Sequence, residues 1–173
     1  MNKKIILFFI AVLWVIVAAA MIISKQSTLR RGKTVVLETV PVDPRDLLRG
    51  DYVILRYKIS TLDLDQIKNE KPDYKRGEVI YVKLEPKERF WEATAVQAKR
   101  SADNEIYIRG KVRYCYSKKL EVIYGIESYF VPEGEGREIE KNIRREKSSV
   151  NVEAIVDSGG NALIKKVYID KDR

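Results

Sequence analysis

The pattern of hydrophobic and polar positions changes once along the chain. Residues 5–23, IILFFIAVLWVIVAAAMII, form a continuous apolar run without a charge. As a helix this run would span roughly 28 Å, close to the thickness of the hydrocarbon core of a bilayer. A helix in the core of a globular domain would carry polar residues on one face, and this run carries none. The pattern predicts a transmembrane helix within residues 1–24.

Two interpretations of this segment differ in whether it is cleaved. Lys3 and Lys4 precede it like the basic region of a signal peptide, and residues 18–20 (Ala-Ala-Ala) have the form of a cleavage site. The apolar run nevertheless continues past Ala20 to Ile23, and no Cys follows that would make a lipoprotein. We therefore expect an uncleaved, single-pass signal anchor in the cell membrane.

Two signals in the sequence favour opposite sides of the membrane for the rest of the chain. Basic residues after the apolar run outnumber those before it, and the positive-inside rule would then keep the C-terminal part in the cytoplasm. A lone signal-like segment near the N-terminus, however, commonly carries the following domain across the membrane. We expect an extracytoplasmic domain.

From residue 34 onwards apolar and polar residues mostly alternate, which is typical of strands. Strands are predicted near 34–40, 52–59, 78–84, 91–99, 105–115, 120–131, 150–156 and 162–169. DSGGN joins the last two as a hairpin. The predicted fold is mainly β: an N-terminal transmembrane helix (1–24), a polar tether (25–33) and one antiparallel β sandwich or barrel-like domain (34–173).

Two segments of the domain are expected to form short surface helices. TLDLDQIKNE (61–70) has room for one or two turns before Pro72. GREIEKNIRREK (136–147) has acidic residues in its first turn and basic residues in its last, which suits the helix dipole. Arg-Gly pairs at 49–50, 76–77 and 109–110 each precede a β-like run, where glycine would permit a sharp turn into the strand.

Composition narrows the chemistry that this chain can perform. It contains no His, and Cys115 is its only Cys, which excludes His-dependent triads, His-based metal sites and an internal disulfide. We predict no cofactor and no metal. The net charge is +8, but acidic residues are interspersed throughout, which disfavours a nucleic-acid-binding role. The basic residues near the anchor fit either anionic lipid headgroups or a solvated surface of mixed charge.

The segment VPVDPRDLLRGDYVILRY (40–57) concentrates charged and turn-forming residues before a strand. Asp43 and Pro44 are typical of a helix start, Gly50 of its left-handed exit, and Asp51 can accept backbone N–H groups at the corner. In the strand, Val53, Leu55, Tyr57 and Ile59 share one face. We expect this face to be buried, with the Tyr57 hydroxyl bound to a polar partner. A structural role is favoured over a reaction site.

Two segments carry a resemblance to a known family. GDYVILRY (50–57) fits Gly-Asp-Tyr-x-x-Leu-x-Tyr, and YGIESYFVPEGEG (124–136), with PVDPRDLLR before the first motif, matches other marked segments. The chain resembles the GDYXXLXY proteins over essentially its whole length. The resemblance implies a small bacterial protein with an N-terminal membrane segment, an accessory role beside polytopic membrane proteins, and no defined catalytic residue.

The favoured hypothesis is a membrane-anchored, non-catalytic β domain that binds a partner such as a polytopic membrane protein. The candidate contact residues are those of the two motifs: Asp43, Arg45, Arg49, Gly50, Asp51, Tyr52, Leu55, Tyr57, Glu127, Tyr129, Phe130, Glu133 and Gly134. A purely structural role at strand ends and turns would also explain why these residues occur here.

Two alternative hypotheses remain. The first is a hydrolase of the signal-peptidase type, which uses a Ser-Lys pair and needs no His. Its nucleophile would lie shortly before Gly50, where the sequence is Val-Asp-Pro-Arg; Ser60, Ser101 and Ser128 have basic neighbours in sequence only. The second is an anion-binding module at EGEGREIE (133–140), where glycines precede the expected helix but glutamates would repel an anion.

Overall fold

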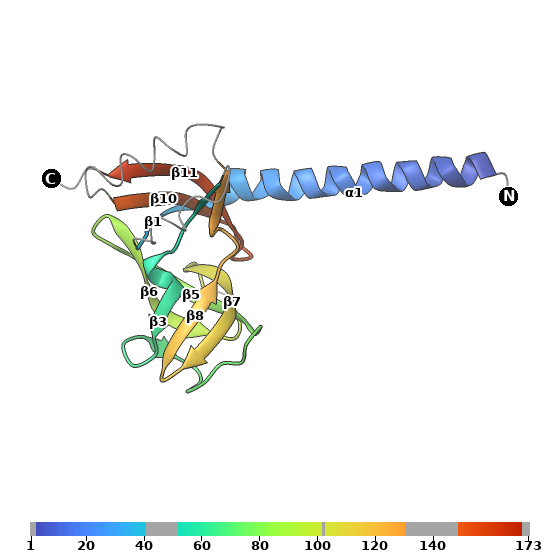
Figure 1. Cartoon of the computed structure of the whole chain (residues 1–173). Coiled ribbons are helices and arrows are strands. Elements are labelled where there is room, and N and C mark those ends of the chain that lie inside the picture. The colour runs from blue at the N-terminus through green and yellow to red at the C-terminus, as the bar shows by residue number, and fades with distance from the viewer. Residues whose placement is uncertain (1–2, 41–51, 102, 131–148, 171–173) are drawn as a thin grey trace.

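The computed structural model describes residues 3–40, 52–101, 103–130 and 149–170. A long helix, α1 (Lys3–Arg31), leads into a β-rich domain (Figure 1). The remaining elements are β1 (Lys33–Glu38), β2 (Tyr52–Ile54), the 3-10 turn η1 (Lys58–Ser60), β3 (Thr61–Asp63), β4 (Lys68–Asn69), β5 (Val79–Lys87), β6 (Phe90–Gln97), β7 (Ile106–Tyr116), β8 (Lys119–Ile123), β9 (Ser128–Phe130), β10 (Ser149–Val156) and β11 (Ala162–Asp170). The predicted fold class, mainly β with an N-terminal helix, is confirmed.

The strands form three sheets. One has the order β1-β10-β11, the second pairs β2 with β9, and the third has the order β3-β8-β7-β5-β6-β4. Pairing is antiparallel except between β4 and β6, which are parallel, so the third sheet is mixed. No sheet among the described strands closes into a barrel.

A single hydrophobic core joins the three sheets. It includes Val35 of β1, Val53 of β2 and Ile80 of β5, each almost fully buried. The period-two pattern explains this, because alternate side chains of a strand point to the same face. The expectation that Val53, Leu55, Tyr57 and Ile59 form a buried face is confirmed.

The prediction of helical turns at residues 61–70 is wrong. Residues 61–63 form β3, and Leu62 and Leu64 alternate into the core instead of following a helical period. Asp63 accepts the N–H of Asp65, and the Asn69 amide donates to the carbonyls of Leu64 and Ile67. These side-chain bonds hold a turn between β3 and β4, because Asp and Asn compete with a helix for backbone groups.

Two details of the predicted strands also differ from the structure. The strand expected at 120–131 is split into β8 and β9 by a turn, in which Gly125 has a φ of 81°. Gly110 does not precede a strand but lies inside β7, whereas Gly77 does lie before β5, with a φ of 85°. The helix expected at 136–147 and the corner at 43–51 lie outside the described residues.

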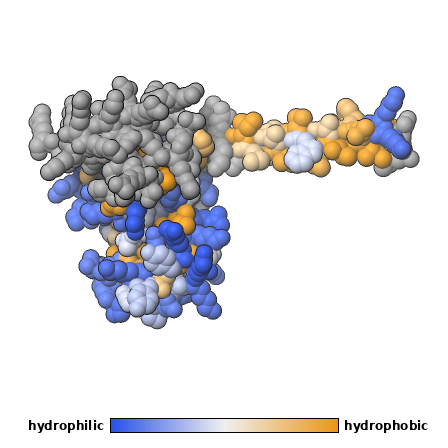
Figure 2. Space-filling view, viewed as in Figure 1, coloured by the Kyte–Doolittle hydropathy of each residue, from blue (hydrophilic) through white to orange (hydrophobic). Residues whose placement is uncertain are grey.

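The segment Lys3–Ile23 of α1 is long and apolar enough to cross a membrane, and none of it is buried against the domain. Residues 24–31, most of the expected tether, continue the same helix, and β1 begins at Lys33. Figure 2 shows this apolar helix projecting from a domain whose described surface is largely hydrophilic. The helix therefore has the length and exposure of a single-pass anchor.

Candidate functional site

The two motif segments lie against each other in the fold. β2 pairs with β9 in antiparallel register, with Val53 opposite Tyr129. The contact continues beyond the strands, since the N–H of Leu55 donates to the carbonyl of Glu127 at 2.8 Å. We call this contact, formed by residues 52–59 and 124–130, the motif junction.

Two buried tyrosines cross the motif junction in opposite directions. The Tyr57 hydroxyl donates to the carbonyl of Ile126, and the Tyr124 hydroxyl donates to the carbonyl of Ile59 at 2.7 Å. Tyr57 is 1% exposed and Tyr124 is 7% exposed. Each segment thus satisfies a backbone carbonyl of the other, which holds the two segments in one register.

The Glu127 side chain closes the turn at the end of the junction. Its carboxylate accepts the N–H of Tyr124 at 2.5 Å and the N–H of Gly125 at 2.9 Å. Gly125 has a left-handed backbone that favours glycine. A carboxylate that accepts two backbone N–H groups stabilises the turn in which the chain leaves β8.

The electrostatics of the junction oppose acid–base chemistry by its tyrosines. Burial, and secondarily the negative charge of Glu127, raises the pKa of Tyr57 well above its ordinary value, and the same two causes raise the pKa of Tyr124. Both phenols therefore stay protonated and act as hydrogen-bond donors to carbonyls. The junction has the properties of a structural clamp.

A comparison with protein families now bears on these segments. The family model described as GDYXXLXY protein matches residues 14–167, most of the chain. The chain belongs to the GDYXXLXY family. No curated protein and no solved structure matches it. In the GDYXXLXY signature of this chain, the Leu and the final Tyr are Leu55 and Tyr57, and both lie in the core.

The structure places six of the thirteen predicted contact residues of this GDYXXLXY protein. Leu55, Tyr57 and Glu127 meet in the junction, while Tyr129 is partly buried against the core and Phe130 is 77% exposed. Tyr52 is placed by its backbone, opposite Phe130. The other predicted contacts lie outside the described residues: Asp43, Arg45, Arg49, Gly50, Asp51, Glu133 and Gly134.

Of the serines considered for a Ser-Lys pair, Ser60 is buried and its hydroxyl accepts the N–H of Tyr57. Lys58, two residues away, binds Glu38 at 3.0 Å and Glu92 at 3.2 Å, and these hydrogen bonds raise its pKa. A lysine that acts as general base needs a lowered pKa. Ser101 and Ser128 are exposed. Lys58 therefore does not have the properties of a base for Ser60.

A polar cluster that the sequence did not predict lies where β5 and β7 pair. Lys83 contacts Glu105 at 2.5 Å and Glu85 at 2.8 Å, and the Tyr107 hydroxyl donates to Asp103 and Glu105 at 3.1 Å each. Hydrogen bonds, first to Glu105 and then to Glu85, raise the pKa of Lys83. The cluster lines a cavity of about 390 Å³. Because Lys83 and the Tyr107 hydroxyl together bind its three carboxylates, the cluster fits a stabilising network.

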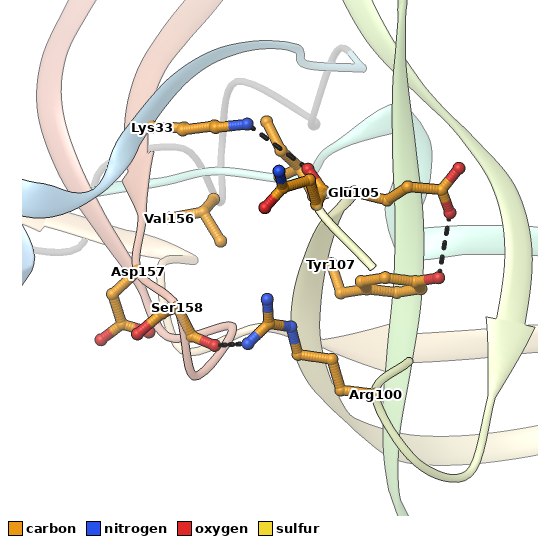
Figure 3. Close-up of a pocket in the computed structure, with 9 residues that line it drawn as sticks. Lys33, Arg100, Glu105, Tyr107, Val156, Asp157 and Ser158 are labelled. Atoms are coloured by element: carbon orange, nitrogen blue, oxygen red, sulfur yellow. Dashed lines mark hydrogen bonds between the residues drawn. The ribbon is translucent and has the colours of Figure 1, made fainter. Parts of the chain in front are cut away.

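A second cavity, of about 170 Å³, lies beside the end of α1 (Figure 3). Lys33 reaches into it from β1 and donates to the carbonyl of Asn104 at 3.4 Å, while Arg100 donates to the carbonyl of Ser158. Its walls combine the β6–β7 connection with the β10–β11 turn. No pattern in the sequence predicts this site, because the pairing of β1 with β10 places Lys33 beside Val156 and the packing of another sheet adds residues 100 and 104–107.

Proposed function

We propose that this GDYXXLXY protein is a membrane-anchored, non-catalytic β domain that serves as an accessory or binding component of a membrane-associated complex. The observation that carries the proposal is the apolar helix Lys3–Ile23, none of which is buried in the domain. An apolar surface of this size needs a cover, and a single-pass position in the membrane supplies one. The domain lies on the extracytoplasmic side in this proposal, as the signal-like N-terminus favours.

The motif junction supports a binding role over catalysis. Its tyrosines and Glu127 are engaged with backbone groups, so they hold a surface in shape and carry no reactive group. The domain also exposes aromatic side chains at the end of β7, where Tyr114 is 51% and Tyr116 is 78% exposed. Arg113 lies beside them and contacts Glu121. Tyr and Arg are the residues most often found at the centre of protein interfaces.

Membrane extraction tests the anchor. The full chain should remain in the membrane pellet after an alkaline carbonate wash. The double variant Leu13→Lys with Ile16→Lys should be released, because each lysine at the helix centre costs about 2.5–3.5 kcal/mol of insertion free energy. Leu13→Ala combined with Ile16→Ala is the matched control and should remain. A wild-type chain that washes off would refute the anchor.

Labelling tests the side of the membrane. A reporter cysteine, Lys119→Cys in a Cys115→Ser background, lies at an exposed position of β8. A membrane-impermeant maleimide should label it in intact spheroplasts as fully as in broken ones. Labelling only after lysis would place the domain in the cytoplasm.

Photo-crosslinking tests the binding role. A photoreactive phenylalanine in place of Tyr116 should crosslink to a polytopic membrane protein in native membranes. The same group in place of Lys87, exposed in the β5–β6 hairpin, is the control and should not. A chain that forms no crosslink and is purified as a lone monomer in mild detergent would argue against an accessory role.

A further inference from the structure

The cations of the domain fall into two classes. Some bind carboxylates, such as Lys58, Lys83 and Lys118. Others are exposed and form no ion pair with a carboxylate of the described residues. We use the name basic face for a set of the second class: Lys33, Lys75, Arg76, Arg100, Arg109 and Lys111. Within the part of the chain that the structure describes, none of the six charges is neutralised by an ion pair.

The first part of the basic face lies directly after α1. Lys33 opens β1 and lies opposite Val156, the last residue of β10. Lys33 and Arg100 point toward the same cavity and bind neutral backbone carbonyls there, at Asn104 and Ser158 (Figure 3). Carbonyl partners leave the positive charge of both side chains in place, together with further N–H donors.

The second part continues along β7. The N–H of Arg109 donates to the carbonyl of Gly160 in the β10–β11 turn at 2.8 Å, so this strand adjoins the turn that Arg100 contacts. Lys111 follows two residues later on the same face of β7. A Cβ built on Gly77 would lie 3.7 Å from Cε of Lys111, which places the turn bearing Lys75 and Arg76 beside it. The cations therefore form one continuous surface.

Three carboxylates lie near this surface, and each has a partner outside the basic face. Glu105 binds Lys83 and Tyr107, and Glu78 binds Lys71 at 2.5 Å. Asp157 accepts the N–H groups of Gly159 and Asn161 within its own turn. Six cations stand beside these three carboxylates, so the basic face keeps a net positive charge.

The elements that carry the basic face lie on the side of the domain from which α1 leaves. Figure 1 shows α1 projecting from the side that carries β7 and the β10–β11 turn. The helix continues for residues 24–31 beyond the apolar segment, which adds about 12 Å at 1.5 Å per residue. The headgroup layer on one side of the hydrocarbon core is roughly 5–8 Å thick, so the domain begins a few ångströms beyond it, within reach of long lysine and arginine side chains. A membrane that holds Lys3–Ile23 would meet the domain at this side.

We propose that the basic face binds the anionic phospholipid headgroups of the membrane that α1 enters. The ligand is the phosphate-bearing headgroup, which the exposed ammonium and guanidinium groups of the basic face attract. This contact lays the domain on the membrane surface and fixes its orientation for a partner in the same membrane. The inference rests on the proposed anchoring of α1.

Lysine labelling of the full chain in nanodiscs tests the contact. Acylation of Lys33, Lys75 and Lys111, read by mass spectrometry, should slow at least about twofold when phosphatidylcholine is replaced by phosphatidylglycerol-rich lipid. Lys87, in the β5–β6 hairpin, is the internal control and should not change. Salt at roughly 1 M, where the screening length falls to about 3 Å, should abolish the difference.

A charge-reversal pair sharpens the test. Arg109→Glu with Lys111→Glu should remove the lipid-dependent protection of Lys33 and Lys75, whereas Lys87→Glu with Lys118→Glu, which reverses the same number of charges elsewhere, should retain it. An anchored chain with equal labelling in both lipids would overturn the inference and leave the anchor intact. Protection only in native membranes would indicate a protein partner instead and also overturn it. A chain that enters neither nanodisc would refute the anchor itself.

Discussion

The hydroxyl groups of Tyr57 and Tyr124 each donate to a carbonyl of the opposite motif segment, at Ile126 and Ile59. A buried carbonyl without a donor is costly, so these bonds matter more for what their loss would expose than for their own strength. At this scale the GDYXXLXY signature is explained by packing and hydrogen bonding: Leu55 fills the core, and Tyr57 fills it while satisfying a distant backbone group.

Tyr57→Phe should destabilise the domain by about 1–3 kcal/mol, because it leaves the Ile126 carbonyl buried without its donor. Urea unfolding of the detergent-solubilised chain would measure this. Tyr116→Phe is the matched control: Tyr116 is 78% exposed, and the change should stay within about 0.5 kcal/mol. Equal effects of the two substitutions would show that the bond across the junction contributes nothing.

Tyr107 gives the domain a dependence on alkaline pH. Burial, followed by hydrogen bonds to Glu105 and Asp103, raises its pKa from 10.0 to about 12. The folded state then holds the phenolic proton more tightly than the unfolded state, so this contribution to stability is complete below pH 10 and is lost as the pH rises toward 12. The free energy of unfolding should fall less steeply in Tyr107→Phe than in the wild type over this range. If the free energy of unfolding fell equally steeply with pH in both proteins, the raised pKa of Tyr107 would be contradicted.

At the scale of elements, β7 and β8 pack closely because Gly110 has no side chain. A Cβ at this position would lie 2.2 Å from Cγ1 of Val122 and 3.0 Å from Cε1 of Tyr124. The sequence suggested a turn glycine here, since an Arg-Gly pair before a β-like run resembles the pair at Gly77. The structure shows instead a glycine required by the approach of a neighbouring strand.

Gly110→Ala should therefore destabilise the domain by about 1–3 kcal/mol through overpacking. Val122→Ala removes the methyl group in the way, so the double variant should be more stable than the sum of the two single changes predicts. Gly125→Ala serves as a control with no neighbour within 4 Å, and its cost should be unaffected by Val122→Ala. Additive costs at Gly110 and Val122 would refute the steric explanation.

At the scale of the whole molecule, α1 and the domain are nearly independent. The helix has few contacts with the domain, chiefly at β10 and β11, and its residues 3–23 are exposed. Among the side chains that the structure describes, the core that joins the three sheets contains none from α1. The domain should therefore need the helix for location and not for folding.

A chain of residues 33–173 should accordingly remain folded, with a melting temperature within about 4 °C of that of the full chain, since such a difference corresponds to less than about 1 kcal/mol. Circular dichroism on heating would measure it, with the full chain in detergent as the reference. A fragment that aggregates on expression or lacks a cooperative transition would show that α1 contributes to the core.

The sequence by itself determined the elements whose pattern is local: the apolar helix, the alternating strands β5, β6, β7, β10 and β11, and the buried face of Val53, Leu55, Tyr57 and Ile59. Periodicity and composition act over a few neighbouring residues, so they can be read along the chain. Only the tertiary structure decided that two motifs some 70 residues apart are bonded to each other, as Tyr57 is to Ile126. It also decided that Lys33, Arg100 and Arg109 share one surface, because strand register, which sets these neighbours, depends on the packing of all three sheets.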